Sequence, residues 1–288
     1  MTDHETPEPR SEFVESTATR IVRRAAKYAD AEYRVVHRRN GAPGEQALLD
    51  SLNADVEAVL GRYDPPSTRR RGDSLVFSHL YAEAKDAAPP SPALDEDGRA
   101  VVDVIAALLA AEVESRGPLR LSRTQNTLLA GVYEQLGAQL RELGLPAHAV
   151  LAYRRAASLH RLNEDMDAVD RCGLWQARAR CQATPPGWRR IGPQLSDLLC
   201  GYGYKPFRLL GWIAVQLALF SVALLLFEHG SVSDTLYMSM TSYLNPMGLG
   251  DTADLAEGGR ALLATESWVG TVSLSVFFAL LVRRWFRL

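Results

Sequence analysis

The stretch SMTSYLNPMGLGDTAD, residues 239–254, lies between the two most apolar segments of the 288-residue chain. A Ser/Thr-rich run, typical of a helix end, leads into it, and Gly248, Gly250 and Asp251 follow. This segment is either an ordinary loop that joins two hydrophobic helices or the ion-coordinating lining of a pore. The elements on either side of it are the first evidence for choosing between these interpretations.

Two long apolar segments flank this stretch. Leu209 to Phe227 contains 19 consecutive residues without a charge, and a helix of that length extends about 28 Å, close to the hydrocarbon thickness of a bilayer. Ala261 to Val282 is the second segment, and only Glu266 interrupts it. We therefore expect two membrane-spanning helices rather than two core helices of a soluble protein.

The flanking charges predict the orientation of this hairpin. Basic residues lie before the first segment and after the second: Arg189, Arg190, Lys205, Arg208, Arg283, Arg284 and Arg287. The connection between the segments has Arg260 as its single Lys or Arg, against five acidic residues. Because basic residues stay on the cytoplasmic side, we expect a multi-pass protein of the cell (plasma or inner) membrane with cytoplasmic N- and C-termini. The polar N-terminus has no signal-peptide pattern.

The connection itself is longer than a simple loop requires. Ser233 and Asp234 can cap a short helix, and an amphipathic helix of about ten residues follows, with Thr241 and Ser242 near its end. Glu266 is costly inside a bilayer. We expect this intramembrane acid to lie behind the loop, facing protein rather than lipid, or else to reach the outer surface.

On these residues the chain resembles the two-transmembrane, potassium-channel-like pore module. That module has an outer helix, a re-entrant pore helix, a selectivity filter and an inner helix. The resemblance implies that Thr241 and Ser242 end the pore helix and that Gly270 is a gating hinge. In such filters backbone carbonyls replace the hydration shell of the ion. The filter residues it implies are Asn245, Pro246, Met247, Gly248, Leu249, Gly250 and Asp251.

Family filters usually carry Thr at the positions of Asn245 and Pro246, an aliphatic residue at Met247 and Tyr at Leu249, so this segment departs from the family pattern. The permeant monovalent cation is therefore K+ or a wider set of cations, and no cofactor is expected. The resemblance implies a homo-oligomer, most simply a tetramer, that acts as a cation channel. The alternatives are a membrane-anchored adaptor whose pore-like hairpin does not conduct, and a toxic pore that opens when a partner engages the cytoplasmic domain.

Residues before the hairpin predict a cytoplasmic helical domain. We expect a disordered tail over 1–10, a helical region over 11–118, a tetratricopeptide-like domain over 119–200 and the pore module over 205–288. Helices are expected over about 12–38, 45–63, 75–85, 99–115 and 165–182. The run VVDVIAALLAAEV is too short to cross a bilayer and is expected to be a buried helix. The predicted fold class is therefore all-α.

One helical repeat stands out between Ala130 and Ala156. The key offsets of the 34-residue tetratricopeptide unit are occupied by Tyr133, Leu136, Gly137, Leu140, Ala149, Tyr153 and Ala156. Small residues allow two antiparallel helices to approach, and Gly144-Leu145-Pro146 marks the turn between them. The junction GYGYKPFRLLGW, residues 201–212, resembles that of bacterial proteins that join a helical, repeat-like cytoplasmic domain to this pore module. The resemblance implies a protein or small-molecule ligand that acts on the helical domain.

Other chemistry is not expected from the sequence. The six histidines are scattered, with His148 and His160 expected on the surface, and neither catalytic nor metal-ligand spacing occurs. We expect free thiols in a reducing compartment at the three cysteines, Cys172, Cys181 and Cys200. The net charge of -2 gives no reason for a nucleic-acid partner. We therefore predict no enzyme activity and no metal site. The expected partners are the lipid bilayer, further copies of the chain and a regulatory ligand.

Overall fold

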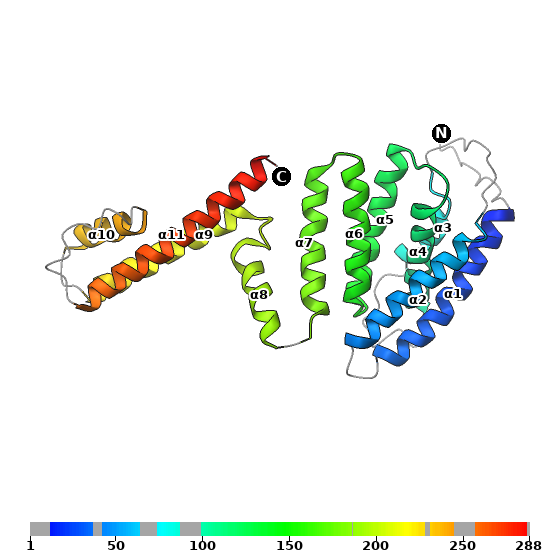
Figure 1. Cartoon of the computed structure of the whole chain (residues 1–288), viewed down its shortest axis with the longest axis horizontal. Coiled ribbons are helices and arrows are strands. Elements are labelled where there is room, and N and C mark those ends of the chain that lie inside the picture. Colours follow the sequence, from blue (N-terminus) through cyan, green and yellow to red (C-terminus); the bar gives the residue numbers. More distant parts are fainter. Residues whose placement is uncertain are drawn as a thin grey trace, which may run out of the picture. The chain divides into compact units, whose positions relative to one another are not determined.

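The computed structural model of the chain is built from helices (Figure 1) and describes residues 12–36, 42–63, 74–86, 99–185, 187–227, 231–244 and 257–286. None of these residues lies in a strand, so the all-α prediction is confirmed for the described part of the chain. The chain divides into two compact units, Met1–Arg190 and Ile191–Leu288. Each unit is described by itself.

The first unit begins with three helices that pack around a fourth, central helix. They are α1 (Glu12–Val36), α2 (Ala42–Leu60), α3 (Ser78–Asp86) and α4 (Arg99–Arg116), and α1, α2 and α3 all pack on α4. Side chains from Val104 to Val113 are at most 2% exposed. The prediction that this apolar run forms a buried helix is therefore confirmed.

Two buried acids of α4 are held by neighbouring helices. Glu112 receives Arg155 Nε and Nη2, each at 2.8 Å, and the hydroxyl of Tyr133 at 3.0 Å. Glu114 accepts the backbone N–H of Val76 at 2.6 Å and the hydroxyl of Tyr81 at 2.9 Å. A buried carboxylate is tolerated when partners of this kind replace its hydration. These acids therefore fix how α4 meets its neighbours.

Three further helices stand side by side in the first unit: α5 (Arg123–Glu142), α6 (Pro146–Leu162) and α7 (Met166–Ala183). Ser122 and Gln125 form a capping box at the start of α5, and Asp165 accepts the backbone N–H of Ala168 at the start of α7. Gly144 turns the chain between α5 and α6 with φ of 82°, a conformation that glycine adopts without strain. Short turns of this kind make α5, α6 and α7 antiparallel neighbours.

The small residues of the predicted repeat lie at the contact between α5 and α6. A Cβ on Gly137 would lie 2.8 Å from the Tyr153 ring, so only glycine allows this approach. Ala149 and Ala156 are fully buried, as are Tyr133 and Leu140. The sequence spacing therefore matches an antiparallel helix pair with a tight interface.

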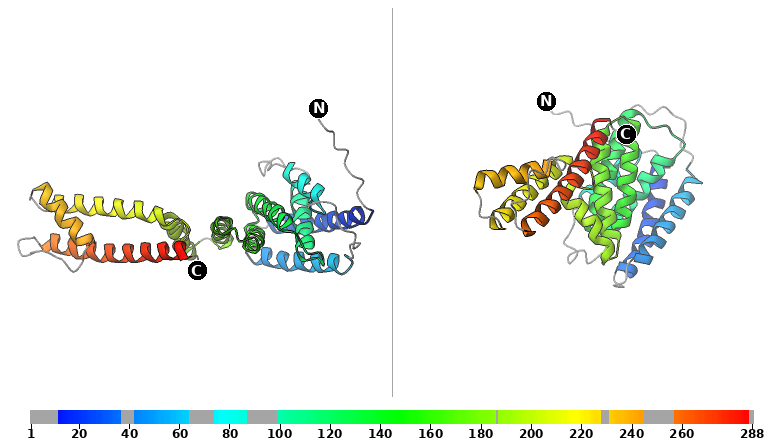
Figure 2. Two further views of the ribbon diagram at one scale, coloured as in Figure 1. Left: turned by 90° about the horizontal axis from the view of Figure 1, so that it is seen from above. Right: turned by 60° about the vertical axis from the view of Figure 1, so that its left-hand side comes forward.

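The second unit contains α8 (Trp188–Cys200), which starts just before the division, and α9 (Pro206–Phe227), α10 (Val232–Leu244) and α11 (Glu257–Phe286). α9 and α11 lie side by side, and α10 packs on both (Figure 2). α8 was not predicted from the sequence. Pro206–Leu226 and Gly258–Arg283 are long and apolar enough to cross a membrane.

Details of two helix starts differ from the prediction. Ser231, rather than Ser233, caps α10, because its Oγ accepts the Asp234 backbone N–H at 3.3 Å and donates to the Asp234 carboxylate at 2.6 Å. α11 begins at Glu257, earlier than expected, so Gly259 and Arg260 belong to its first turns rather than to a loop. Hydropathy alone missed this start, because the first turns of α11 are polar.

Candidate functional site

The candidate site is the region where α10 contacts both long helices of the second unit. A first polar link joins Ser221 of α9, Ser239 of α10 and Glu266 of α11. The Ser239 hydroxyl donates to Glu266 Oε1 at 2.5 Å, and Ser221 Oγ lies 2.9 Å from Ser239 Oγ. All three side chains are buried. We call this set the serine link.

A second polar link joins the same helices further along α10. The hydroxyl of Tyr243 donates to Gln216 Oε1 at 2.7 Å, and Ser273 Oγ donates to the same oxygen at 3.1 Å. Gln216 belongs to α9, Tyr243 to α10 and Ser273 to α11. We call this set the tyrosine link. Hydrogen bonds between helices at two levels fix both the position and the rotation of α10.

The two links define the direction in which α10 runs. Ser239 contacts α9 at Ser221, whereas Tyr243 contacts α9 at Gln216, nearer to the start of α9. The C-terminal end of α10 therefore turns back along α9. Gln216 lies 11 residues before Phe227, which corresponds to about 16 Å along a helix. α10 consequently ends beside the middle of α9.

Gly270 permits the closest contact between α10 and α11. A Cβ at this position would lie 2.5 Å from the Tyr243 backbone oxygen and 3.1 Å from Tyr243 Cγ. Any larger residue would force the two helices apart. Gly270, predicted as a hinge, thus has a packing role that spacing did not reveal. Whether it also bends α11 stays a prediction.

Glu266 faces protein rather than the outside of the helix pair. It is fully buried, and its Oε1 is bonded to Ser239. Its second oxygen, Oε2, has no hydrogen-bond partner among the described residues. Ser242 is also buried and donates to the Leu263 backbone oxygen at 3.2 Å, whereas Thr241 bonds to carbonyls of its own helix. Ser239, Ser242 and Tyr243, on one face of α10, therefore hold it against α11 and α9.

The implied filter lies outside the described residues. This applies to Asn245, Pro246, Met247, Gly248, Leu249, Gly250 and Asp251. The described part of the predicted site consists of Thr241, Ser242, Glu266 and Gly270, all on α10 or α11. Of these, Ser242, Glu266 and Gly270 meet at the contact between the two helices.

The junction before α9 is held against the end of α11. Gly201, Tyr202 and Gly203 all have positive φ, between 54° and 83°, so the chain reverses sharply there. A Cβ on Gly203 would lie 3.2 Å from Leu280 Cδ2, and the Arg283 guanidinium lies 5.3 Å from the centre of the Tyr204 ring. This cation–π contact and the close approach of Gly203 connect the junction to the C-terminal part of α11.

The sequence did not indicate which residues form the hydrogen bonds around the predicted site. Ser221, Ser239 and Ser273 are ordinary serines of apolar helices, and nothing in their spacing marked them. One residue could have indicated such hydrogen bonds between helices: Gln216, the most polar residue of its apolar run. A polar side chain in a membrane helix is expected to find an interhelical partner, and Gln216 has two.

Two histidines of the first unit also differ from the prediction. His148 and His160 are buried rather than on the surface. His148 Nε2 lies 2.6 Å from the hydroxyl of Tyr28, and its Nδ1 lies 3.1 Å from Glu45. The prediction was wrong because α1 and α2 cover α6 at His148, a contact between segments about 100 residues apart. His160 is covered by α5 and α7.

Comparisons of the chain with protein-family models, with curated proteins and with solved structures gave no match.

Proposed function

We propose that the chain is one subunit of an oligomeric cation channel, most simply a tetramer, with residues 245–251 as its filter. The observation that carries this proposal is the place where α10 ends. Tyr243 reaches Gln216 near the middle of α9, so if α9 spans the bilayer, the next residues start close to mid-membrane. Non-helical backbone is tolerated at that depth only where it lines a cavity or is buried in protein.

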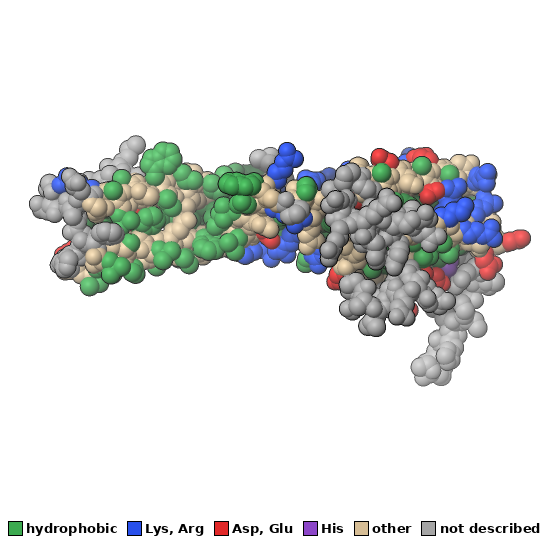
Figure 3. All heavy atoms as spheres, turned by 90° about the horizontal axis from the view of Figure 1, so that it is seen from below, with side chains coloured by type: hydrophobic (Ala, Val, Ile, Leu, Met, Phe, Trp, Pro, Cys, Tyr) green, Lys and Arg blue, Asp and Glu red, His purple; other side chains and the backbone are tan. Residues whose placement is uncertain are grey.

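Surface character supports membrane insertion and assembly. Hydrophobic side chains are spread over the visible face of the second unit (Figure 3). Only 22% and 17% of the two candidate spans is buried within one chain. On α10, Leu236, Tyr237, Met240 and Leu244 are exposed, opposite to the polar residues that bind α9 and α11. Lipid and neighbouring subunits would cover these surfaces, and several copies are needed because one filter strand supplies only part of a ring of carbonyls.

α8 fits the membrane surface in this proposal. Its exposed apolar residues Trp188, Ile191, Leu195 and Leu198 recur at spacings of three and four, which places them on one face of the helix. Basic residues accompany this helix at Arg189 and Arg190. An amphipathic helix with these features lies in the interface between lipid and water. We therefore place α8 on the cytoplasmic surface of the bilayer, just before the first span.

The first unit acts as the cytoplasmic regulatory domain in this proposal. The α5–α6 pair has the tetratricopeptide spacing, and α7 packs beside α6 as a third helix. A row of antiparallel helices of this kind is expected of a repeat-like ligand-binding domain. A ligand signal would reach the pore through the junction, because Gly203 and Tyr204 contact α11 at Leu280 and Arg283. Both termini would then lie in the cytoplasm.

The test is ion flux through the purified full-length protein reconstituted in planar bilayers, with K+ and Na+ compared. We expect cation current that Gly248→Ala and Gly250→Ala abolish or make non-selective, because the added methyl groups restrict the backbone of the filter. Gly211→Ala is the matched control, since no atom lies within 4 Å of a Cβ there. Absence of current under varied ligands, together with a monomer in detergent, would contradict the proposal.

The runner-up is a membrane-anchored adaptor, and the residues Pro246 and Leu249 favour it, since they depart from the filter pattern. An adaptor would bind its partner equally well with or without the two filter glycines. Partner binding that survives both filter substitutions, in a protein without current, would select the adaptor. Growth arrest on overexpression that the filter substitutions remove would instead indicate a toxic pore.

A further inference from the structure

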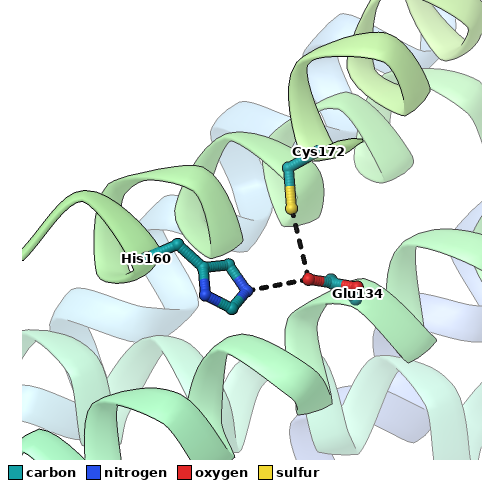
Figure 4. A group of neighbouring side chains, drawn as sticks. All are labelled: Glu134, His160 and Cys172. Carbon is teal, nitrogen blue, oxygen red and sulfur yellow. Dashed lines mark hydrogen bonds and ion pairs between the residues drawn. The ribbon is translucent and has the colours of Figure 1, made fainter. Parts of the chain in front are cut away.

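Three side chains with different donor atoms meet in the first unit, far in sequence from the proposed pore (Figure 4). They are Glu134 of α5, His160 of α6 and Cys172 of α7. One oxygen, one nitrogen and one sulfur from these residues all lie within 4.8 Å of one another. His160 Nε2 is 2.8 Å from Glu134 Oε1, and Cys172 Sγ is 3.4 Å from the same oxygen.

The spacing of these atoms suits a tetrahedral metal ion. Zinc binds thiolate sulfur at about 2.3 Å and imidazole nitrogen or carboxylate oxygen at about 2.0–2.2 Å. Ligand atoms around such an ion are therefore roughly 3.3–3.8 Å apart. The observed 2.8 Å and 3.4 Å separations, both to Glu134 Oε1, require changes of about half an ångström, and the nitrogen–sulfur pair, which lies within 4.8 Å, has to close by about 1 Å. The three donors come from three neighbouring helices, so small side-chain movements suffice.

The surroundings provide further features of a metal site. His160 Nδ1, the nitrogen that would not bind the metal, lies 4.0 Å from Asp165 Oδ2. Metal-binding histidines commonly direct their second nitrogen at a carboxylate, which orients the ring. Arg171 Nε lies 3.4 Å from the second oxygen of Glu134, Oε2. Glu134 Oε1 faces the other two donors and the Arg171 guanidinium.

Access to the group is from one side. Cys172 is completely buried and His160 nearly so, whereas 25% of the Glu134 side chain and 52% of the Arg171 side chain are exposed. Arg171 also contacts Oε1 at 3.0 Å, and its exposure lets it move away without repacking the core. An ion would enter past Glu134 and Arg171 and reach the sulfur last.

We propose that Glu134, His160 and Cys172 form a binding site for a thiophilic divalent transition-metal ion, with Zn2+ as the best match. Binding replaces the proton of the Cys172 thiol, which leaves to solvent, and uses neutral His160 and ionised Glu134. Solvent occupies the fourth position. The bound ion joins α5, α6 and α7, and so stiffens the helical row. The proposal does not depend on the channel function of the second unit.

The test uses Co2+ as a spectroscopic substitute for Zn2+. The untagged full-length chain in detergent is freed of metal with a chelator and titrated with Co2+. We expect a thiolate-to-Co2+ charge-transfer band in the near ultraviolet that saturates at one ion per chain and disappears on addition of Zn2+. Cys172→Ser should remove the band, and His160→Gln and Glu134→Gln should each weaken Co2+ binding at least tenfold.

Cys181→Ser and Cys200→Ser are the matched controls, because both residues are half-buried free cysteines outside the group, and both variants should keep the band. Far-ultraviolet circular dichroism checks that each variant is folded, and Zn2+ should raise the unfolding temperature of the wild type but not of Cys172→Ser. No charge-transfer band in the wild type at millimolar Co2+ would overturn the proposal. A band of unchanged strength in Cys172→Ser would overturn it as well.

Discussion

The hydroxyl of Ser239 donates a hydrogen bond of 2.5 Å to Glu266, joining α10 to α11 where both side chains are buried. This is the one hydrogen bond of the Glu266 carboxyl to a described residue, since Oε2 has no such partner among them. A buried polar group that loses its partner costs about 1–3 kcal/mol. The position of α10 therefore depends strongly on this pair.

Ser239→Ala should destabilise the second unit by about 1–3 kcal/mol, because it leaves Glu266 without its donor and separates Ser221 from the serine link. The measurement is thermal unfolding of the protein in detergent. Thr265→Ala is the control, since Thr265 is exposed on α11, the helix of Glu266, and its hydroxyl donates to the Ala261 carbonyl of that helix. Equal stability of the two variants would show that the serine link does not hold α10.

Gly270→Ala should displace α10 from α11, because the new methyl group would lie 2.5 Å from the Tyr243 carbonyl oxygen. We expect the free energy of unfolding to fall by about 1–3 kcal/mol, the range for overpacking, and the unfolding temperature to fall with it. Gly211→Ala, in open surroundings on α9, should gain up to about 1 kcal/mol through helix propensity. If both substitutions stabilise the protein, the close contact at Gly270 does not exist.

Arg155→Leu should cost the first unit about 3–5 kcal/mol, because it removes both guanidinium bonds from the fully buried Glu112. Arg154→Leu is the matched control, since Arg154 is the exposed neighbour on the same helix. Urea unfolding followed by circular dichroism compares the two. A double variant, Glu112→Leu with Arg155→Leu, should recover most of the loss, because no charge is then left unpaired.

Alkaline pH should destabilise the first unit through Tyr81. Burial, and then the nearby carboxylate of Glu114, raise the pKa of Tyr81 well above its ordinary value. The folded state holds the phenol proton more tightly than the unfolded chain does. The resulting contribution of Tyr81 to the free energy of unfolding is complete below pH 10 and is lost as pH rises through the folded-state pKa. Absorbance at 295 nm should therefore show Tyr81 ionising only with unfolding.

Tyr81→Phe provides the comparison for this pH dependence. It should lower stability at pH 7, because Glu114 loses one of its donors, and should reduce the slope of stability against pH above pH 10. An unchanged slope in Tyr81→Phe would assign the alkaline loss to other groups.

Arg283→Gln tests the junction. It removes the cation–π contact with Tyr204, worth about 0.5–2 kcal/mol, and should alter the open probability of the proposed channel while leaving its ion selectivity unchanged. Arg208→Gln is the control, because Arg208 is exposed near the start of α9. Identical gating of both variants would remove the junction from the proposed coupling path.

The local pattern of the chain predicts its helices well. Expected ends of the helices in the first unit lie within about three residues of those observed, because apolar spacing, Pro and Gly act locally. The expected starts of α9 and α11 are late by three and four residues, since their first turns include polar residues. α8 was missed altogether, because its sequence contains Gly192 and Pro193, which are typical of a loop.

By itself, the sequence determined the helical class, the two apolar spans and the small residues that allow α5 to meet α6. Each of these depends on neighbours within about one repeat. Only the tertiary structure decided that Ser221, Ser239 and Glu266 are hydrogen-bonded to one another in the serine link. It also decided that Tyr243 packs against Gly270. The same holds for the donor atoms of Glu134, His160 and Cys172, which lie close together. Each of these groups combines residues of two or three different helices, and packing rather than sequence spacing sets the distances between helices.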